Sequence, residues 1–600
     1  MMQEAKLVIE KIKAEEYEHL IKHGIDPLVA KILYRRGISS VEEAKTFLEA
    51  CVLHDPGEIK NIEKVYKIID EVISKREKVY IFGDYDVDGI TATAIMYNTL
   101  KELGADVYYR LPDRLTEGYG MTTTAVKELH EKGCSLIITV DNGISCHEEI
   151  AFAKELGMKV IIIDHHTPSE TLPNADAIVD LHVKGETYPY VDLAGCGVAF
   201  KVSCYLYDQF GFGAEEGYKN IDLAAIGTVA DVMPLTGENR TIVKEGLKLI
   251  NSPEYDRIGI ISLMNVFEIE IGTLTSMDIG FKLGPALNAP GRLLEEGADQ
   301  ALELLLCDEE DEAINIAMDL KEVNEKRKTV TQECLMYAEK HIEEENLLKD
   351  KVLVLFIPHI PEGVAGLVSG KLTEKYHRPS IVFSEGVEFY KASGRSIESF
   401  NLYEALRSCH DLFVSYGGHA QAAGMSMIKD EKKLKELRTR INQYADKTIK
   451  KEDLQKTIYV DETLKAEDIN FSLIEKLSAM EPFGHMNPKP IFYVKGYKTV
   501  KKNRDGQWLP YLYMGEHNNH LKLYGESGDV VGFDMVSKYE AAGRPKQLDL
   551  VFTLGVNNFM GRQFLQLEMI DFKPAQIEED THTDLMKALS NALEEINLVG

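Results

Sequence analysis

The sequence predicts an α/β protein in which a parallel-sheet lobe is joined by a long helix to a smaller α/β lobe, followed by a β-barrel. Three observations support this class. Short apolar strands alternate with helices from residue 78 to residue 163, which is typical of βαβ units around a parallel sheet. A long polar helix is expected over 308–345, and strand-like alternation returns after Asp461.

The elements of the first lobe are short and well separated. Apolar runs of strand length are followed by segments with helical spacing that mostly end at glycine. The expected strands are KVYIF (78–82), DVYYR (106–110), CSLIITV (134–140) and KVIII (159–163), and the expected helices are 90–104, 122–133 and 147–157. Ligands of such sheets bind beyond the carboxyl ends of the strands, so the segments after each strand are candidate sites.

The remaining segments complete the division of the chain. A second α/β unit begins after Lys351 with VLVLFI, and LDLVFTL (548–554) and FLQLEMIDF (564–572) alternate like strands of a small barrel. The predicted parts are an N-terminal helical segment (1–55), a parallel-sheet domain (56–307), a connecting helix (308–346), a second α/β domain (347–450), a barrel domain (455–575) and a C-terminal helix or tail (576–600).

Composition restricts the possible classes of function. The net charge of −30 argues against a protein that coats nucleic acid nonspecifically, although a local basic groove stays possible. No apolar run reaches the roughly 18–20 residues of a membrane span, and the N-terminus lacks the apolar core of a signal peptide. Eight cysteines without a CxxC pair indicate neither a disulfide framework nor a zinc site, so we expect a reduced, cytoplasmic protein.

Three carboxylates alternate in GDYDVDG (83–89), at Asp84, Asp86 and Asp88. Carboxylates this close repel one another, and a bound cation relieves the repulsion. A calcium loop of the EF-hand type opens similarly, but its twelfth position requires a bidentate Glu, and here that position is Ile95. A plain surface turn is the other alternative.

Further candidate ligands lie at similar places. Asp141 and Asp164-His165-His166 each follow a buried strand, and Asp231 interrupts the apolar stretch IGTVADVMPL. Mixed carboxylate and imidazole ligands suit Mn²⁺, with Mg²⁺ as the alternative. Two such ions can activate water for phosphoester hydrolysis, with Asp141 as the candidate bridge. Hydrolysis by water is expected because the sequence contains neither a GxSxG motif nor a Walker motif.

These motifs resemble those of the DHH phosphoesterase family, and together they resemble its branch of single-strand-specific exonucleases over roughly residues 50–575. The matching segments are GDYDVDG, VDNGIS (140–145), DHH (164–166), GTVADVMPL (227–235), PDRLTEGYG (112–120), AGCGVAFK (194–201), GPALNAPGR (284–292), SGRS (393–396), GGHAQAAG (417–424) and EPFGHMNPKP (481–490). The resemblance implies a DHH catalytic lobe, a DHH-associated lobe and an OB-fold domain. It also implies cleavage of single-stranded DNA from 5′ to 3′ into mononucleotides with two Mn²⁺ or Mg²⁺ ions.

Site residues follow from the same resemblance, position by position. The implied metal ligands are Asp86, Asp88, Asp141, His165 and Asp231. Asp84, Asp164 and His166 would complete the catalytic site, with Asp164 orienting a ligand histidine. Arg114, Arg292, Ser393 and Arg395 would bind the 5′-phosphate, and His419 would lie near the strand.

The sequence departs from the branch at four positions. Ile360-Pro361 stand where Trp-His is common, Ala286 where arginine is common, and Ala392 where glycine is common. These changes spare the metal ligands, so we expect them to alter strand affinity, length preference and processivity rather than the chemistry.

Two further predictions concern the barrel region and the binding partners. Lys501, Lys502, Arg504 and Trp508 combine positive charge with an aromatic ring, as a single-strand groove requires, although a charged hairpin would look the same. We expect a monomer that acts on single-stranded DNA, beside a single-strand-binding protein or a helicase. Two alternatives are a hydrolase of short oligonucleotides or cyclic dinucleotides and a noncatalytic repair scaffold.

Overall fold

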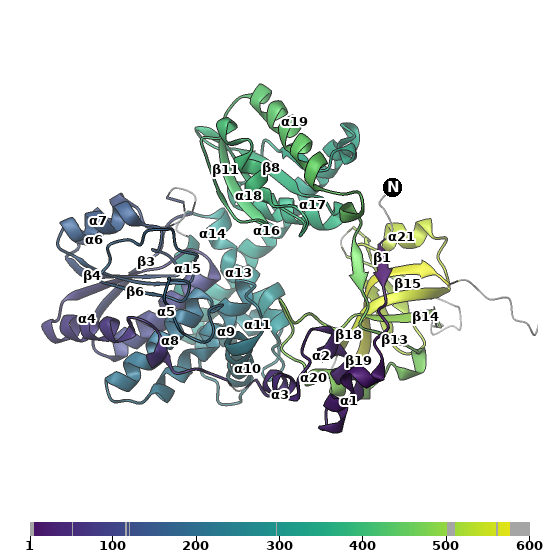
Figure 1. Cartoon of the computed structure of the whole chain (residues 1–600), viewed down its shortest axis with the longest axis horizontal. Coiled ribbons are helices and arrows are strands. Elements are labelled where there is room, and N and C mark those ends of the chain that lie inside the picture. The colour runs from purple at the N-terminus through teal and green to yellow at the C-terminus, as the bar shows by residue number, and fades with distance from the viewer. Residues whose placement is uncertain are drawn as a thin grey trace, which may run out of the picture. The chain divides into compact units, whose positions relative to one another are not determined.

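The computed structural model describes residues 5–50, 52–114, 117–118, 120–295, 297–500, 511–515, 517–559 and 562–575 (Figure 1). They form two compact units. The first consists of Glu49–Lys456 and Pro482–Pro488, and the second of Glu4–Leu48, Thr457–Glu481 and Lys489–Gly600 in their described residues. None of the described helices combines the length and apolar character needed to cross a bilayer.

The first unit contains a five-stranded parallel sheet with the order β3-β2-β4-β5-β6. The four predicted strands are all present, and β6 was not predicted. Their bounds are β2 (Lys78–Phe82), β3 (Asp106–Arg110), β4 (Cys134–Val140), β5 (Lys159–Asp164) and β6 (Ala177–Asp180). The predicted α/β class with a parallel sheet is confirmed.

Helices cover both faces of this sheet, which explains why its central strands are apolar at nearly every position. Val79 and Ile81 of β2 pack into the core shared with α4, α5 and α8, whereas Tyr80 and Phe82 pack into the core shared with α6 and α7. The helix bounds are α4 (Ile62–Lys75), α5 (Val87–Glu102), α6 (Thr123–Glu131), α7 (His147–Glu155) and α8 (Gly195–Gln209).

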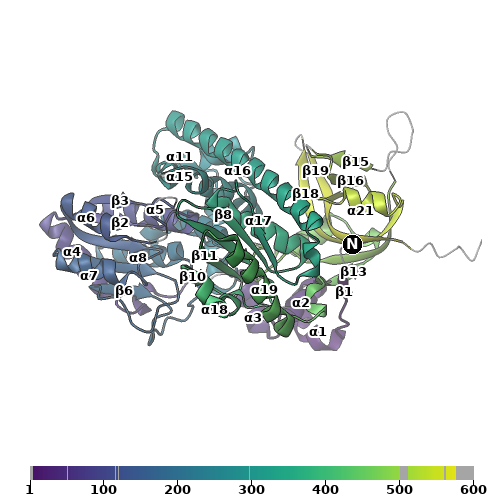
Figure 2. The same ribbon diagram turned by 90° about the horizontal axis from the view of Figure 1, so that it is seen from above.

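A helical region follows the sheet and extends its core. It consists of α9 (Ile221–Ala230), α10 (Gly237–Ile250), α11 (Ile258–Val266), α12 (Ser276–Asp278), a π-helical turn (Ile279–Leu283), α13 (Gly284–Asn288), α14 (Pro290–Leu293) and α15 (Gly297–Leu306). The connecting helix α16 then runs over Glu310–Glu344 and is readily followed in Figure 2. Its 35 residues correspond to about 52 Å at 1.5 Å per residue.

The smaller lobe of the first unit contains a second sheet with the order β10-β11-β9-β8-β7. Only β7 and β8 are parallel, and the other pairs are antiparallel. The bounds are β7 (Leu353–Phe356), β8 (Ser380–Glu385), β9 (Phe389–Arg395), β10 (Ser415–Gly418), β11 (Ala422–Ile428), α17 (Glu362–Tyr376), α18 (Leu402–Arg407) and α19 (Glu431–Thr448).

The second unit is built around a seven-stranded sheet with the order β13-β14-β18-β19-β17-β16-β15. The predicted strands 548–554 and 564–572 lie in β18 and β19. The bounds are β13 (Glu462–Leu464), β14 (Phe492–Lys498), β15 (Tyr511–Met514), β16 (His520–Tyr524), β17 (Asp529–Gly532), β18 (Gln547–Phe559), β19 (Arg562–Pro574), α20 (Phe471–Ser478) and α21 (Val536–Ala541). The expected C-terminal helix or tail lies outside the described residues.

The N-terminal segment is helical, as expected, and also contributes a strand to the second unit. The helices are α1 (Ala14–Lys22), α2 (Pro27–Arg35) and α3 (Val41–Glu49). Before them, β1 (Lys6–Val8) pairs in parallel with β12 (Thr457–Tyr459). An ion pair between Lys31 and Glu462 joins α2 to the start of the seven-stranded sheet.

Candidate active site

The GDYDVDG segment leads from β2 into α5, and its carboxylates have different positions. Asp86 is the N-cap of α5, where its carboxylate accepts the backbone N–H groups of Asp88 (3.0 Å) and Gly89 (3.2 Å). The helix therefore begins at Val87, three residues earlier than the sequence indicated. Asp88 is consequently in the first turn of α5, where an anionic side chain is favoured.

Asp88 is fixed by a second helix as well. Its two carboxylate oxygens accept the backbone N–H groups of Gly195 (2.7 Å) and Cys196 (2.8 Å) at the start of α8. Free N–H groups at a helix N-terminus bind anions well. The AGCGVAFK motif thus serves as an anchor for the Asp88 side chain.

Asp141 directly follows β4 and has a left-handed backbone, with φ of 60°. Its N–H donates to the carbonyl of Ile163 in the neighbouring strand (2.9 Å). Asp tolerates this conformation better than most residues do. The side chain is almost completely buried at the carboxyl end of the sheet.

The DHH segment is organised by its aspartate. Asp164 accepts the backbone N–H groups of His165 (2.8 Å), His166 (3.2 Å) and Ile144 (3.0 Å). The ring Nδ1 of His166 lies 2.8 Å from the same carboxylate. Although burial opposes ionisation, these bonds and the positive charge of His166 lower the pKa of Asp164. An aspartate with this many donors orients both histidines.

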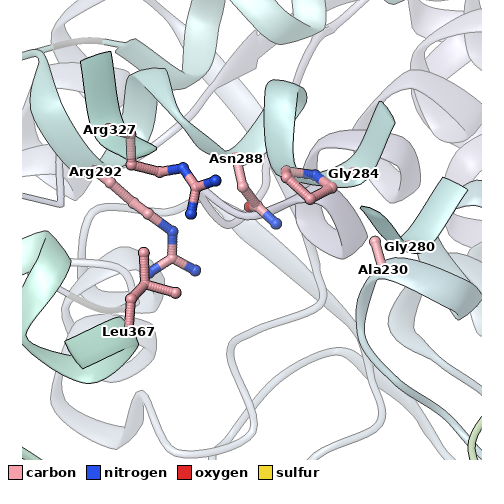
Figure 3. A pocket seen from close by; sticks show the side chains of 8 residues that line it. Ala230, Gly280, Gly284, Asn288, Arg292, Arg327 and Leu367 are labelled. Carbon is pink, nitrogen blue, oxygen red and sulfur yellow. The ribbon is translucent and has the colours of Figure 1, made fainter. Parts of the chain in front are cut away.

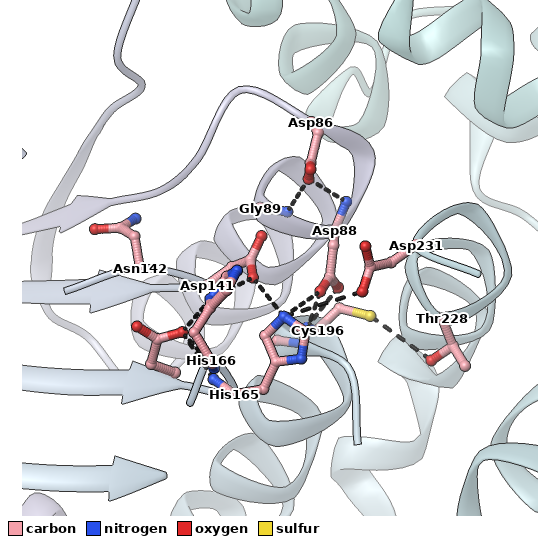
Figure 4. Close-up of polar contacts among 12 residues, drawn as sticks. Asp86, Asp88, Gly89, Asp141, Asn142, His165, His166, Cys196, Thr228 and Asp231 are labelled. Atoms are coloured by element: carbon pink, nitrogen blue, oxygen red, sulfur yellow. Dashed lines mark hydrogen bonds and ion pairs between the residues drawn. The ribbon is translucent and has the colours of Figure 1, made fainter. Parts of the chain in front are cut away.

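His165 lies at the centre of the carboxylates (Figure 4). Its Nε2 is 3.1 Å from Asp141 Oδ1, 3.6 Å from Asp88 Oδ2 and 4.0 Å from Asp231 Oδ2. Burial lowers the pKa of His165, which favours the neutral ring with a free lone pair. Asp231, the C-cap of the apolar helix α9, reaches the same point from another part of the chain.

Three groups of side chains could each hold a metal ion. Within each group the ligand atoms lie no more than 4.8 Å apart. The groups are Asp141, His165 and His166; Asp88, His165 and Asp231; and Asp84, Asp86 and Asp141. With Asp164 bonded to His166, all eight residues predicted for the metal and catalytic site come together, and Asp141 and His165 each belong to two groups.

Crowding of the carboxylates changes their acidity. Burial, followed by the charge of neighbouring carboxylates, raises the pKa of Asp86 and raises the pKa values of Asp84 and Asp141 well above the ordinary value. The same causes raise the pKa of Asp231 to about 8. The site thus disfavours its own negative charge, which is a common property of functional sites.

The residues fit a divalent metal. Asp84 Oδ1 is buried and has no hydrogen-bond partner among the described residues. Such an atom is costly unless a cation or donor satisfies it. Carboxylate oxygens with a neutral imidazole are suitable ligands for Mn²⁺ and acceptable ones for Mg²⁺.

Three glycines allow the segments of the site to approach closely. A Cβ atom on Gly89 would lie 2.6 Å from the backbone nitrogen of Asp84, and one on Gly195 would lie 2.7 Å from Asp141 Cβ. A Cβ on Gly227 would lie 2.3 Å from Thr91 Oγ1 and 3.1 Å from Asp88 Oδ1. No side chain fits at these positions without displacement of the site.

The metal-free protein is expected to lose stability as pH rises toward about 8. A carboxyl whose pKa is raised by folding keeps its proton in the folded state while the unfolded chain has already lost it, so stability falls as pH increases. His166, with a pKa of about 9, acts in the same direction because its bound proton is lost as pH passes that value. The melting temperature in EDTA between about pH 5.5 and 8.5 tests this expectation.

Asp231→Asn is expected to reduce that decline because the amide does not titrate. Added Mn²⁺ should also reduce it, since binding to the folded state offsets the repulsion. A melting temperature that rises with pH in EDTA would contradict the assigned pKa shifts.

Four residues predicted for the 5′-phosphate also come near one another. Burial and the charges of Arg114 and Arg327 lower the pKa of Arg292 to about 10. Burial and the charge of Arg114 likewise lower the pKa of Arg395, whose Nη1 donates to Ser393 Oγ (3.2 Å). The guanidinium of Arg114 lies over the ring of Tyr85, 4.9 Å from its centroid.

Three further sets of residues were singled out from the sequence: His419, the departures from the family pattern and the basic and aromatic residues of the barrel region. His419 is exposed in the turn between β10 and β11. Three of the four departures from the family pattern are buried, with exposed fractions of 0% for Ala286, 4% for Ile360 and 9% for Ala392, whereas Pro361 is half-buried. The three buried residues belong to hydrophobic cores. Lys501, Lys502, Arg504 and Trp508 lie outside the described residues.

Two residues near the site were not singled out from the sequence. Asn288 accepts the backbone N–H of Val87 (3.2 Å), so it supports the start of α5, and its place within GPALNAPGR was a usable signal. Arg327 of α16 lines a pocket together with Arg292. Nothing in the polar helix distinguished it from the surrounding charged residues.

The parallel sheet and the carboxylate-histidine cluster at its carboxyl edge define the chain as a phosphoesterase of the DHH class. The model described as "DHH family, N-terminal domain" matches residues 78–228. The "DHHA1 domain" matches 349–447, and the "RecJ OB domain" matches 460–571. The expected DHH-associated and OB-fold domains are thereby confirmed.

Known proteins specify the family further. The chain is 36% identical over 578 residues to the single-stranded-DNA-specific exonuclease RecJ of Bacillus subtilis (strain 168), a match that covers 94% of this chain and 71% of that protein. It is 33% identical to the protein of the same name from Haemophilus influenzae, covering 91% and 96%. The crystal structure of RecJ in complex with Mn²⁺ from Thermus thermophilus is 27% identical, with a TM-score of 0.76 over 95% of this chain and 80% of that one. The chain belongs to the RecJ family.

Proposed function

We propose that this protein is a metal-dependent exonuclease that hydrolyses single-stranded DNA from its 5′ end and releases 5′-mononucleotides. The observation that carries the proposal is the cluster around Asp141 and His165, in which two residues each serve two possible metal groups. It is supported by the relatives named above, which are single-stranded-DNA-specific exonucleases.

The candidate ligands are Asp86, Asp88, Asp141, His165 and Asp231, with Asp84 and His166 completing two ion sites for Mn²⁺ or Mg²⁺. When bound, such ions lower the pKa of water and neutralise charge on a phosphoester. The protein's own contribution is positioning. The α8 N-terminus fixes Asp88, Asp164 aligns His165 and His166, and Asn288 supports the helix that carries the acidic motif.

We attribute the 5′-to-3′ polarity of cleavage to three arginines that would bind the 5′-phosphate. A terminal phosphate monoester carries up to one more negative charge than an internal diester and has an additional free oxygen. The charge of Arg114 acts on both Arg292 and Arg395, and Ser393 adds a hydroxyl beside Arg395. Guanidinium groups suit a phosphate dianion, so these residues are our candidates for the 5′-end pocket.

We also propose which segment of the chain has which role. We assign catalysis to residues 56–307, strand contacts to 347–450 with His419, and further strand binding to 455–575. The cysteines of the described residues are all free, which supports a reduced, cytoplasmic environment.

Strands labelled at either end test the function directly. With Mn²⁺ or Mg²⁺, a 5′ label is expected to leave first as a mononucleotide, whereas a 3′ label should stay on long products until late. EDTA should abolish both reactions, and blunt duplexes should resist cleavage. Early loss of the 3′ label would overturn the polarity, and cleavage confined to dinucleotides would favour a small-oligonucleotide hydrolase.

A further inference from the structure

A pocket of the first unit is lined, among the described residues, by two arginines and by no acidic side chain (Figure 3). It encloses about 390 Å³, its open mouth included. The lining residues are Ala230, Gly280, Gly284, Pro285, Asn288, Arg292, Arg327 and Leu367. Ala230 precedes the candidate ligand Asp231, so the pocket begins next to the metal cluster.

Arg327 is held in a defined orientation. Its Nε donates to Oδ1 of Asn324 (3.0 Å), one turn earlier on α16, and Asn324 is completely buried. The Nε is therefore occupied, whereas no acceptor in the described part of the chain bonds to the two terminal nitrogens. Figure 3 shows the side chains of Arg327 and Arg292 extending next to each other into the same space.

Neither guanidinium forms an ion pair with a described carboxylate, although the charges of Asp86 and Glu325 act on Arg292 and Arg327 from farther away. Among the described residues, Arg292 donates from Nη1 to the carbonyl of Gly363 (3.2 Å). Partly buried like charges without an anion repel each other, and a bound anion would remove that repulsion.

The pocket differs from the proposed 5′-phosphate site. Arg395 and Ser393 are not among its lining residues. They pack against Gly366 of α17, where an added Cβ would lie 2.9 Å from Ser393 Oγ and 3.2 Å from Arg395 Nη2. Arg292 alone belongs to both places. Positive groups therefore continue beyond the terminal-phosphate site, as in grooves that follow a nucleic-acid backbone.

We propose that Arg327, together with Arg292, binds an internal phosphate of the substrate strand in this pocket. The inference rests on the proposed exonuclease function and adds a substrate-binding residue to it. Arg327 acts on the strand rather than on the metals or the 5′ end. Its loss should therefore affect binding of polymeric strands and spare the end preference.

Binding in EDTA separates affinity from cleavage. Arg327→Gln is expected to weaken binding of a 5′-phosphorylated oligonucleotide about tenfold, the effect of one lost charge-assisted bond. The slope of log affinity against log salt should fall in magnitude by about 0.7, the value for one single-strand phosphate contact. Arg327→Lys should restore most of the slope, since the charge remains. Lys340→Gln removes an exposed charge from the same helix and should change neither quantity.

A neutral methylphosphonate placed at one internal linkage at a time locates the contact. In the wild-type protein, one position other than the cleaved linkage should weaken binding about tenfold. In Arg327→Gln, the same replacement should have little further effect, whereas removal of the 5′-phosphate should weaken both proteins equally.

Several outcomes would overturn the inference. The first is that Arg327→Gln and Lys340→Gln have the same affinity and the same salt dependence. The second is that the methylphosphonate scan of the wild-type protein finds no sensitive internal linkage. The third is that binding by Arg327→Gln no longer depends on the 5′-phosphate. The wild-type scan decides the question even if the variant folds poorly. A wild-type protein that cleaves no single strand would instead refute the proposed function.

Discussion

Replacing Asp141 by asparagine is expected to lower strand hydrolysis by about three orders of magnitude or more while the fold persists. Asp141 belongs to two of the three possible metal groups, so its loss impairs both. Metal assistance is worth several kcal/mol of barrier, and about 4 kcal/mol corresponds to roughly 10³ in rate. Asparagine also tolerates the left-handed backbone at this position, where φ is 60°.

Stability measurements distinguish this loss from unfolding. Because the pKa of Asp141 is raised well above its usual value, the neutral amide should leave the melting temperature in EDTA unchanged or higher. The rise produced by Mn²⁺ in the wild type should shrink. Asp70→Asn, an exposed change on α4, is the matched control. Near-normal activity with two bound metal ions in Asp141→Asn would refute the assignment.

Replacing Arg395 by alanine is expected to reduce the preference for 5′-phosphorylated strands. Lost charge-assisted bonds of roughly 1.5–3 kcal/mol correspond to about 10- to 100-fold on the phosphorylated substrate. A strand with a 5′-hydroxyl should be affected much less, and a small activated diester should still be hydrolysed. The measurement is the ratio of kcat/KM for the two strand types before and after the change.

The control for this experiment is Arg407→Ala. Arg407 is an exposed arginine of α18 in the same lobe, so the variant removes an equal charge without entering the proposed pocket. The ratio of kcat/KM for 5′-phosphorylated and 5′-hydroxyl strands should be the same in Arg407→Ala as in the wild type. If Arg395→Ala also retains the wild-type ratio, Arg395 does not bind the 5′-phosphate.

Local sequence patterns predicted much of the catalytic lobe because its strands and helices are formed by consecutive residues. The strand 78–82 was predicted to the residue, and Asp141 and Asp164 could be placed at one sheet edge from parallel pairing alone. The start of α5 was misplaced because the N-cap role of Asp86 depends on a side-chain bond to the backbone. Such a bond has only a weak signature within an acidic run.

Contacts between distant segments could not be predicted in this way. The pairing of β1 with β12 joins residues about 450 positions apart, and a three-residue strand carries little periodicity. The role of Arg327 could not be predicted either, because a charged residue in a long polar helix is ordinarily solvated. Its pocket appears only when α13, α14, α16 and α17 are assembled.

The three glycines of the candidate active site bear on how the gene can vary. Gly89, Gly195 and Gly227 offer no group that could bind a metal or a phosphate, yet an added methyl group would meet Asp84, Asp141 or Thr91 at under 3.0 Å. Selection for activity therefore reaches beyond the residues that do chemistry to positions defined only by the absence of a side chain. In a library of random substitutions selected for activity, variants at these three glycine codons would be depleted. Variants at the codons of the aspartates that these glycines accommodate would be depleted as well.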